Sequence, residues 1–173
     1  MPLAIEIEGL ERVLGKLDRG LIAGPVRDMF TRAAVVVQGR ARTAAPTDTG
    51  HLRNLITTQV DTAEVPLWAK IGFMGAGEGS PLWHKGRAME YGTGSQGDPE
   101  VGHTGRHWPP GDVLDVWARR HGFENGWQVA AIIGRRGGLR PRRFLRGALE
   151  QSLADIRGLV ERLGREIGQR WGR

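Results

Sequence analysis

The last part of the chain, residues 139–170, reads LRPRRFLRGALEQSLADIRGLVERLGREIGQR. Six of its apolar residues recur at alternating spacings of four and three: Leu149, Leu153, Ile156, Val160, Leu163 and Ile167. Such spacing forms a narrow apolar stripe along one side of an α-helix. Pro141 is compatible with this helix, because proline is tolerated in a first helical turn, and Phe144, Leu145 and Ala148 extend the apolar face backward. The pattern therefore predicts one long amphipathic C-terminal helix that packs its stripe in the core.

A run of arginines leads into this predicted helix. We call it the basic segment, and it comprises Arg135, Arg136, Arg140, Arg142, Arg143 and Arg146, with no acidic residue among them. Residues 101–173 carry fourteen arginines against seven Asp and Glu, whereas residues 1–100 carry eleven Lys and Arg against twelve acids. This uneven distribution favours a polyanionic partner, either nucleic acid or an acidic protein surface.

Composition limits the class of protein. A length of 173 residues predicts a single domain, residues 1–173, with an insertion at about 95–135. Hydrophobic residues at 39% and charged residues at 25% are typical of a folded chain. Cysteine is absent, which excludes disulfides, thiol catalysis and cysteine-ligated zinc. We find no apolar run as long as a membrane span and no signal peptide, so we expect a soluble protein without membrane contacts.

Periodicity in the first 44 residues predicts a strand and two helices. Leu3, Ile5 and Ile7 alternate with less apolar residues, as in a short strand with one buried face. Residues 10–19 have helical spacing and end at glycines. From Pro25 to about Ala44, apolar residues recur on one helical face. We expect this second, long helix to be the partner of the C-terminal stripe.

The middle of the chain predicts a small sheet followed by irregular structure. Residues 45–50 contain the proline and turn residues that end a helix. Residues 55–62 and 67–73 alternate in the manner of an antiparallel hairpin. Residues 95–111 predict an exposed loop, and short helices follow it within 111–133. The predicted fold class is α+β, with a small antiparallel β-sheet packed by two long α-helices, central and C-terminal, and a loop and short-helix insertion.

Candidate catalytic and metal-binding residues are sparse. His103 and His107 are four apart, but the glycines and proline around them argue against the helix that would bring both rings to one metal. No serine has the setting of a nucleophile, and Gly75–Gly77 lacks the rest of a dinucleotide-binding motif. Glu90 is an acid or base candidate without a partner carboxylate at a fixed short spacing. We therefore predict no enzyme activity, no catalytic residue, no metal and no cofactor.

Three segments together resemble a known family. They are APTDTGHLR at 45–53, AMEYGTG at 88–94 and RPRRFLR at 140–146, with IEGL at 7–10 before them. In this order they are similar to the tail-component family of long-tailed double-stranded-DNA bacteriophages, also called neck, tail-completion or head-tail joining proteins. Members of that family show APVDTGxLRxSI, YxxxVEFGT and RPFLRPAL. The resemblance covers most of the chain, excluding roughly residues 95–135.

The sequence departs from the family pattern at two points. Arg142 and Arg143 stand between Pro141 and Phe144, where the family has proline directly before phenylalanine. The aromatic residue that opens the second motif is either Trp83 or absent. The departures put the contacts of the insertion and of the last motif in question, while the order of the motifs is kept.

The resemblance implies a non-enzymatic virion structural protein with an α+β fold. Such a protein assembles in the host cytoplasm as a homo-oligomeric ring, a hexamer or dodecamer, in the neck that joins the DNA-filled head to the tail. Its partners would be copies of itself, adjoining connector and tail tube proteins, and genomic DNA, whose phosphates the basic segment would contact in the lumen. The subunit-interface candidates are Glu90, Tyr91, Gly92, Thr93, Phe144 and Leu145.

Two alternatives remain for the basic segment. In the first, the chain is a sequence-nonspecific basic DNA-binding protein that acts outside the virion. In the second, the arginines form a solvated face and pair with Asp155, Glu161 and Glu166 of the C-terminal helix. Many joining proteins stay monomeric until they meet their neighbours, so a monomer in solution would be compatible with the neck assignment.

Overall fold

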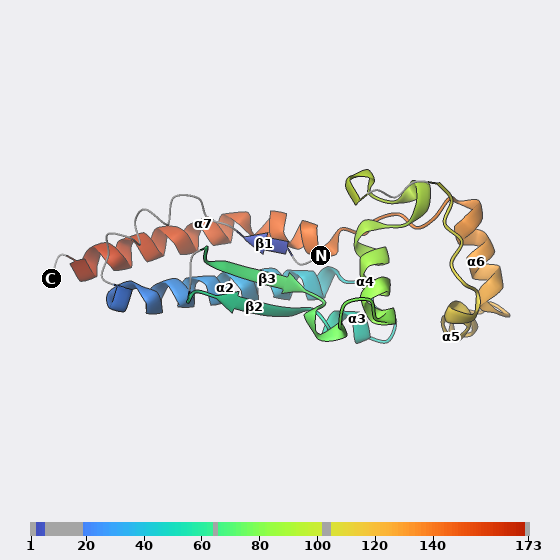
Figure 1. The fold of residues 1–173 in the computed structure, drawn as a ribbon, viewed down its shortest axis with the longest axis horizontal. Coiled ribbons are helices and arrows are strands. Elements are labelled where there is room, and N and C mark those ends of the chain that lie inside the picture. The colour runs from blue at the N-terminus through green and yellow to red at the C-terminus, as the bar shows by residue number, and fades with distance from the viewer. Residues whose placement is uncertain (1–2, 6–18, 64–65, 102–104, 172–173) are drawn as a thin grey trace. The chain divides into compact units, whose positions relative to one another are not determined.

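The computed structural model describes residues 3–5, 19–63, 66–101 and 105–171 (Figure 1). The chain divides into two compact units, one formed by residues 1–83 with 144–173 and the other by residues 84–143. The second unit contains the insertion predicted at about 95–135. Most of the helix predicted at 10–19, and the end of the first predicted strand, lie outside the described residues.

The first unit contains two long helices and a three-stranded antiparallel sheet. The helices are α2 (Arg19–Ala44) and α7 (Phe144–Trp171), and the strands are β1 (Leu3–Ile5), β2 (Thr57–Asp61) and β3 (Trp68–Gly72). The strand order is β1-β3-β2, so β3 lies in the middle. In the hairpin Thr57 is opposite Gly72, and Asp61 is opposite Trp68. The predicted α+β class and the predicted hairpin are confirmed.

The core of this unit lies where α2 packs along α7 and against the sheet (Figure 1). On α2, apolar side chains at helical spacing are buried along one face, among them Val26, Phe30 and Val37. On β3, Ala69 and Ile71 are fully buried, as expected for alternate residues of a central strand. Burial of these side chains supplies the main favourable free energy of folding.

The buried side of α7 differs from the predicted stripe. Phe144, Leu145 and Ala148 are buried as predicted, and further along the helix the structure buries Ser152, Ile156, Leu159 and Leu163. Leu153 and Val160, which we expected in the core, are 45% and 37% exposed. The buried face is therefore rotated by about 50° around the helix axis. The cause is Ser152, a polar residue that a search for apolar periodicity passes over.

Ser152 is buried because its hydroxyl is fully engaged at the interface between α2 and α7. Its Oγ donates to the Ala148 carbonyl at 2.7 Å and accepts from Nη1 of Arg40 at 2.7 Å. The same guanidinium donates to the Gln151 carbonyl at 3.0 Å and pairs with Asp155 at 2.6 Å. One α2 side chain thus satisfies three groups on α7, and Asp155 pairs with α2 rather than with the basic segment.

Both long helices begin at residues other than those predicted. α2 begins at Arg19 and continues through Gly24 and Pro25, where we expected a break and a helix start. A proline removes only one helical hydrogen bond, and burial of Pro25 beside Val26 offsets that loss. α7 begins at Phe144, so Pro141 lies before the helix. The left-handed φ of Arg143, 48°, prevents the helix from extending back to Pro141.

Residues 45–53, the first family-like segment, turn the chain from α2 toward β2. Gly50 has φ 77° and begins the one-turn helix α3 (His51–Asn54), which buries Leu52. Two side chains of α2 then hold the chain before β2, since Gln38 and Arg42 both donate to the Ile56 carbonyl, at 2.8 and 3.0 Å. The role expected for this segment, a turn between helix and strand, is confirmed.

The second unit is built from short elements. Most of α4 (Pro81–Tyr91) belongs to it, followed by the 3-10 turns η2 (Gly94–Gln96) and η3 (Pro99–Val101), then η4 (Asp112–Leu114), α5 (Asp115–Arg120) and α6 (Gly126–Arg135). The two predicted short helices are confirmed. The predicted exposed loop, in contrast, contains the buried Asp98. Asp115 joins α5 to α6 by accepting from the Gly126 amide at 2.6 Å.

Replacing Arg40 should weaken the packing of α2 on α7. We expect Arg40→Leu to lower the free energy of unfolding by about 1–2 kcal/mol, because its hydrogen bonds and ion pair to α7 are lost. Urea denaturation followed by circular dichroism measures this. Arg32→Leu is the matched control, since Arg32 is an exposed arginine of the same helix, and it should cost less than about 0.5 kcal/mol. Equal effects of the two variants would contradict the role assigned to Arg40.

Candidate functional site

Two segments far apart in the sequence run alongside each other in the second unit. We call residues 89–98 and 137–143 the paired segments. The Thr93 amide donates to the Leu139 carbonyl at 2.8 Å, and the Ser95 amide donates to the Gly137 carbonyl at 2.9 Å. The Leu139 amide donates in return to Oγ1 of Thr93 at 3.0 Å. The structure thus brings together most of the second and third family-like segments.

The pairing continues to the end of the basic segment. The Arg142 amide donates to the Met89 carbonyl at 2.8 Å, and the Arg143 amide donates to the Glu90 carbonyl at 3.1 Å. These two carbonyls lie in the last turn of α4, where a helix leaves carbonyl groups without helical partners. The arginine-bearing backbone therefore caps α4, and the long C-terminal helix α7 begins only after it, at Phe144.

Glycine makes the close approach of the paired segments possible. Gly92 has φ 72°, and a methyl group on it would strike the Leu139 carbonyl and the Pro141 nitrogen. Gly138 has φ 134°, and a methyl group there would strike the Thr93 carbonyl. Only glycine adopts such angles without strain while leaving room for another backbone. Gly92, which we predicted at a subunit interface, thus makes its close approach within the chain.

The predicted interface residues are mostly interior. Glu90 is 1% exposed, and Thr93, Phe144 and Leu145 are also buried, whereas Tyr91 is half-buried. In the first unit, Phe144 packs edge-on against Phe73 with ring centroids 5.8 Å apart. A side chain inside its own subunit is not available to a partner, so a partner surface must be sought among other residues.

Some arginines of the basic segment have structural partners. Arg143 pairs at 3.3 Å with Asp98, which is buried and also accepts from the Glu100 amide at 3.1 Å. Arg140 makes a long hydrogen bond, 3.4 Å, to Gln96. Because a buried carboxylate needs compensating charge, Arg143 stabilises Asp98 in the interior of the second unit.

The remaining arginines fall into two groups. Arg146 lies in the first turn of α7, in the first unit, and is half-buried. Arg135, Arg136 and Arg142 are exposed, and their side chains have no hydrogen bond or ion pair with another described residue. These three are the members of the basic segment best able to meet a polyanion.

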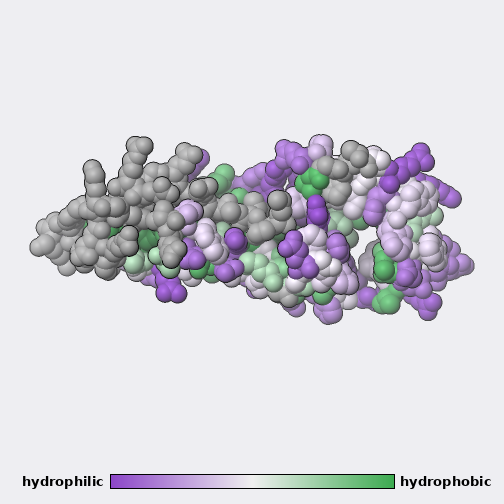
Figure 2. Space-filling model, in the orientation of Figure 1, coloured by the Kyte–Doolittle hydropathy of each residue, from purple (hydrophilic) through white to green (hydrophobic). Residues whose placement is uncertain are grey.

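The surface of the second unit is more basic than its sequence. Its exposed cationic residues in the described part of the chain are Lys85, Arg106, Arg119, Arg120, Arg135, Arg136, Arg140, Arg142 and Arg143. The exposed acidic residues there are Glu100, Asp112 and Glu124. Glu90 and Asp98 are buried, so in the described part of this unit nine exposed cations face solvent against three exposed acids. Figure 2 shows the corresponding hydrophilic surface, interrupted by patches of apolar residues.

Two of the exposed apolar residues are tryptophans that sequence reasoning did not select as functional. Trp108 and Trp127 are 54% and 64% exposed. Trp108 follows a histidine and precedes two prolines, and that setting gives no periodic signal. A tryptophan among glycines, prolines and arginines is itself a usable signal, because such a setting has few apolar neighbours that could bury an indole.

The described residues hold no group of three or more His, Asp or Glu close enough to bind a metal ion. His103 lies outside these residues, and the main chain of His107 packs against Gly94. Ser95 donates its hydroxyl to the Gly137 carbonyl at 3.3 Å, which gives it a structural partner. No helix in residues 19–63, 66–101 or 105–171 is both long and apolar enough to cross a membrane.

Comparison with protein-family models, with curated proteins and with solved structures finds no match. Function must therefore be inferred from this chain's own residues. The paired segments form its structural part, and the exposed arginines form the part that can meet a partner.

Substitution of Gly138 tests the paired segments. We expect Gly138→Ala to lower the free energy of unfolding by roughly 3 kcal/mol or more, because the new methyl group would displace the Thr93 carbonyl. Hydrogen exchange of the Thr93 and Ser95 amides should accelerate in parallel. Gly122→Ala is the matched control: its φ is 81°, but nothing lies within 4 Å, so only strain of about 1–2 kcal/mol is expected. Unchanged amide exchange in Gly138→Ala would contradict the pairing.

Proposed function

We propose that this chain is a non-enzymatic structural protein of a bacteriophage neck, a ring of identical subunits that joins the DNA-filled head to the tail. The observation that carries the proposal is the pairing of residues 89–98 with residues 137–143. Two family-like segments, about fifty positions apart in the sequence, are bonded backbone to backbone, because the amides of Arg142 and Arg143 donate to the carbonyls of Met89 and Glu90. This contact supports the view that the two segments are parts of one connected feature rather than separate short matches.

The exposed arginines give such a ring a way to hold DNA. Arg135, Arg136 and Arg142 lack side-chain partners among the described residues, so they can meet phosphates without breaking an existing ion pair. Contacts of this kind are independent of sequence and weaken with salt. A protein through which DNA passes needs contacts that form and break easily. An acidic rim on an adjoining connector ring would be attracted by the same side chains.

Closure of a ring needs two different surfaces on each subunit, because its contacts are heterologous. Exposed apolar side chains occur in both units: Leu153 and Val160 on α7, and Val113 and Val116 on η4 and α5. Apolar groups in water supply much of the free energy of subunit association. These residues therefore support a subunit that associates with copies of itself or with adjoining rings.

A second candidate is a DNA-binding protein that acts outside the virion, without sequence preference. The excess of exposed cations over exposed acids in the second unit favours it. This candidate needs only a monomer or dimer, whereas the neck protein acts as a closed ring. The two proposals therefore differ in oligomeric state and in affinity for free duplex DNA.

Light scattering across a range of protein concentrations, with and without duplex DNA, separates the two candidates. A discrete hexamer or larger closed ring that forms without DNA would support the neck protein. A monomer that binds duplex DNA tightly at physiological salt would support the second candidate. A monomer that ignores DNA and is also missing from purified phage particles would overturn both.

The division of the basic segment predicts different effects for its members. A triple variant combines Arg135→Gln, Arg136→Gln and Arg142→Gln. Its affinity for duplex DNA should fall, and the negative slope of log affinity against log salt should become shallower by up to about 2.7. The free energy of unfolding should stay within about 0.5 kcal/mol of the parent protein. Fluorescence anisotropy and urea denaturation provide the two measurements.

Arg143→Gln is the comparison variant, because it removes the partner of the buried Asp98. It should lower the free energy of unfolding by about 1–2 kcal/mol, since the pair is half-exposed on the arginine side. Loss of stability in the triple variant, or none in Arg143→Gln, would contradict the division into free and structural arginines.

A further inference from the structure

The two exposed tryptophans of the second unit are held by reciprocal contacts with glycine. A methyl group on Gly134, in α6, would strike Cδ2, Cε3 and Cε2 of Trp108. A methyl group on Gly111 would strike Cδ2, Cγ and Cε2 of Trp127, which also lies in α6. Residues 108–111 therefore run beside α6. Trp127 and Gly134 are seven positions apart in α6, about 10 Å along the helix axis, so the two contacts lie near opposite ends of this helix.

These contacts reveal how the indole rings lie. At each glycine, the three nearest atoms belong to the ring system and are at similar distances from the added carbon. The carbon would thus meet the flat face of the indole rather than its edge. One face of each ring covers glycine backbone, and the exposed fractions of 54% for Trp108 and 64% for Trp127 are consistent with an opposite face in water.

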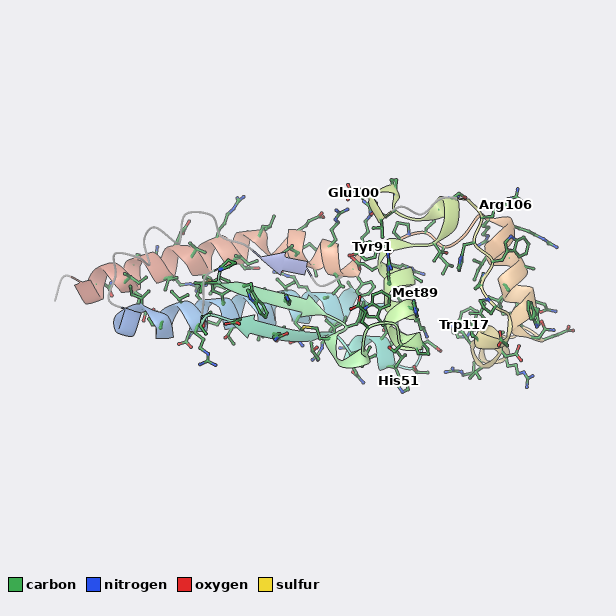
Figure 3. The ribbon with its side chains drawn as sticks, in the orientation of Figure 1. His51, Met89, Tyr91, Glu100, Arg106 and Trp117 are labelled. Carbon is green, nitrogen blue, oxygen red and sulfur yellow. The ribbon has the colours of Figure 1, made fainter. Side chains whose placement is uncertain are left out.

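The two tryptophans differ in the charges around them. Gly134, beneath Trp108, directly precedes Arg135 and Arg136, and Arg106 is two residues before Trp108. All three arginines are exposed and have no side-chain partner among the residues described. Figure 3 shows Arg106 beside the end of α6 that is remote from α5 and Trp117.

Trp127 lies at the opposite end of α6, close to acidic residues. Gln128, the residue that follows Trp127, donates from Nε2 to the Glu124 carboxylate at 2.9 Å. Asp112 is exposed and follows Gly111, the glycine that Trp127 covers. Carboxylates at these positions oppose the binding of a polyanion, so the two indoles have similar seating but differ in the charges of the residues next to them in the chain.

We propose that Trp108, with Arg106, Arg135 and Arg136, binds single-stranded nucleic acid, by stacking on an unpaired base and pairing with its flanking phosphates. An exposed indole face is a platform for any base, and nearby arginines supply the charge that follows the backbone. Within a duplex, base faces are covered by neighbouring base pairs, so this site discriminates against fully paired DNA. The proposal does not depend on the ring assignment, which uses phosphate contacts alone.

An acidic protein surface would be attracted by the same arginines, but it would gain little from a flat aromatic face. The face-on seating of Trp108 therefore favours a planar ligand. A ligand that offers only phosphates would bind the arginines whether or not Trp108 is present. Binding must therefore be compared between ligands of equal charge with and without bases.

The experiment uses the full chain and labelled probes of equal length: oligodeoxythymidine, its abasic counterpart, a duplex and poly-L-glutamate. Fluorescence anisotropy gives the affinities, and quenching of intrinsic tryptophan emission reports stacking. The variants are Trp108→Leu, which keeps an apolar cover on Gly134, and Trp108→Phe, which keeps an aromatic face. The matched control is Trp127→Leu, which removes an indole of equal seating near carboxylates.

Oligodeoxythymidine should bind tighter than the abasic probe and should quench tryptophan emission. Trp108→Leu should weaken that binding roughly 5- to 100-fold and leave the affinity for the abasic probe unchanged. Trp108→Phe should bind oligodeoxythymidine more tightly than Trp108→Leu does. Trp127→Leu should change the affinity for oligodeoxythymidine by less than about twofold. Replacement of Arg106, Arg135 and Arg136 by glutamine should weaken the binding of both probes. The slope of log affinity against log salt should become shallower by about 2.

Three results would overturn the proposal. In the first, the abasic probe binds as tightly as oligodeoxythymidine. In the second, the two leucine variants lose affinity equally, which would assign the effect to general destabilisation. In the third, poly-L-glutamate binds at least as tightly as the oligonucleotide, which would indicate an acidic protein partner. Each result leaves the ring proposal intact, because oligomeric state tests that proposal independently.

Discussion

The second unit depends on a close contact between two stretches of main chain. The main chain at Gly138 lies against the Thr93 carbonyl, and hydrogen bonds between the paired segments hold it there. This contact closes a long excursion of the chain and caps the end of α4. It also sets the course of the basic segment, so that one arginine turns inward to Asp98 while others remain in solvent. The positions of the exposed cations thus follow from a requirement for glycine.

The extent to which the fold could be predicted differs between its elements. The hairpin and most of α2 were predicted because their patterns are local. The buried face of α7 was predicted about 50° away from its true position, because Ser152 becomes a core residue only when Arg40 of another helix meets it. The start of α7 was misplaced because residues 139–143 bond to α4, which lies some fifty positions earlier. Such pairing leaves no periodic trace.

The candidate site shows the same limit in its charges. A run of arginines predicts a basic surface, and much of that surface is present. Its division into structural and free members could not be predicted, because it depends on Asp98, which a carboxylate count treats like any other acid. The contact between the Trp108 ring and Gly134 could not be predicted either. A glycine inside a helix predicts lower helix stability and does not indicate that an aromatic ring packs on it.

The paired segments also determine what the chain tolerates between them. Ser95 and Gly137, at the two ends of this excursion, are joined by a main-chain hydrogen bond, so closure at this point does not require particular side chains in most of the span between them. The entropy of closing such a span grows only slowly with its length. The segment can therefore lengthen, shorten or be exchanged during evolution without altering the anchorage. Variation in what the second unit recognises is then separable from conservation of the scaffold that carries it.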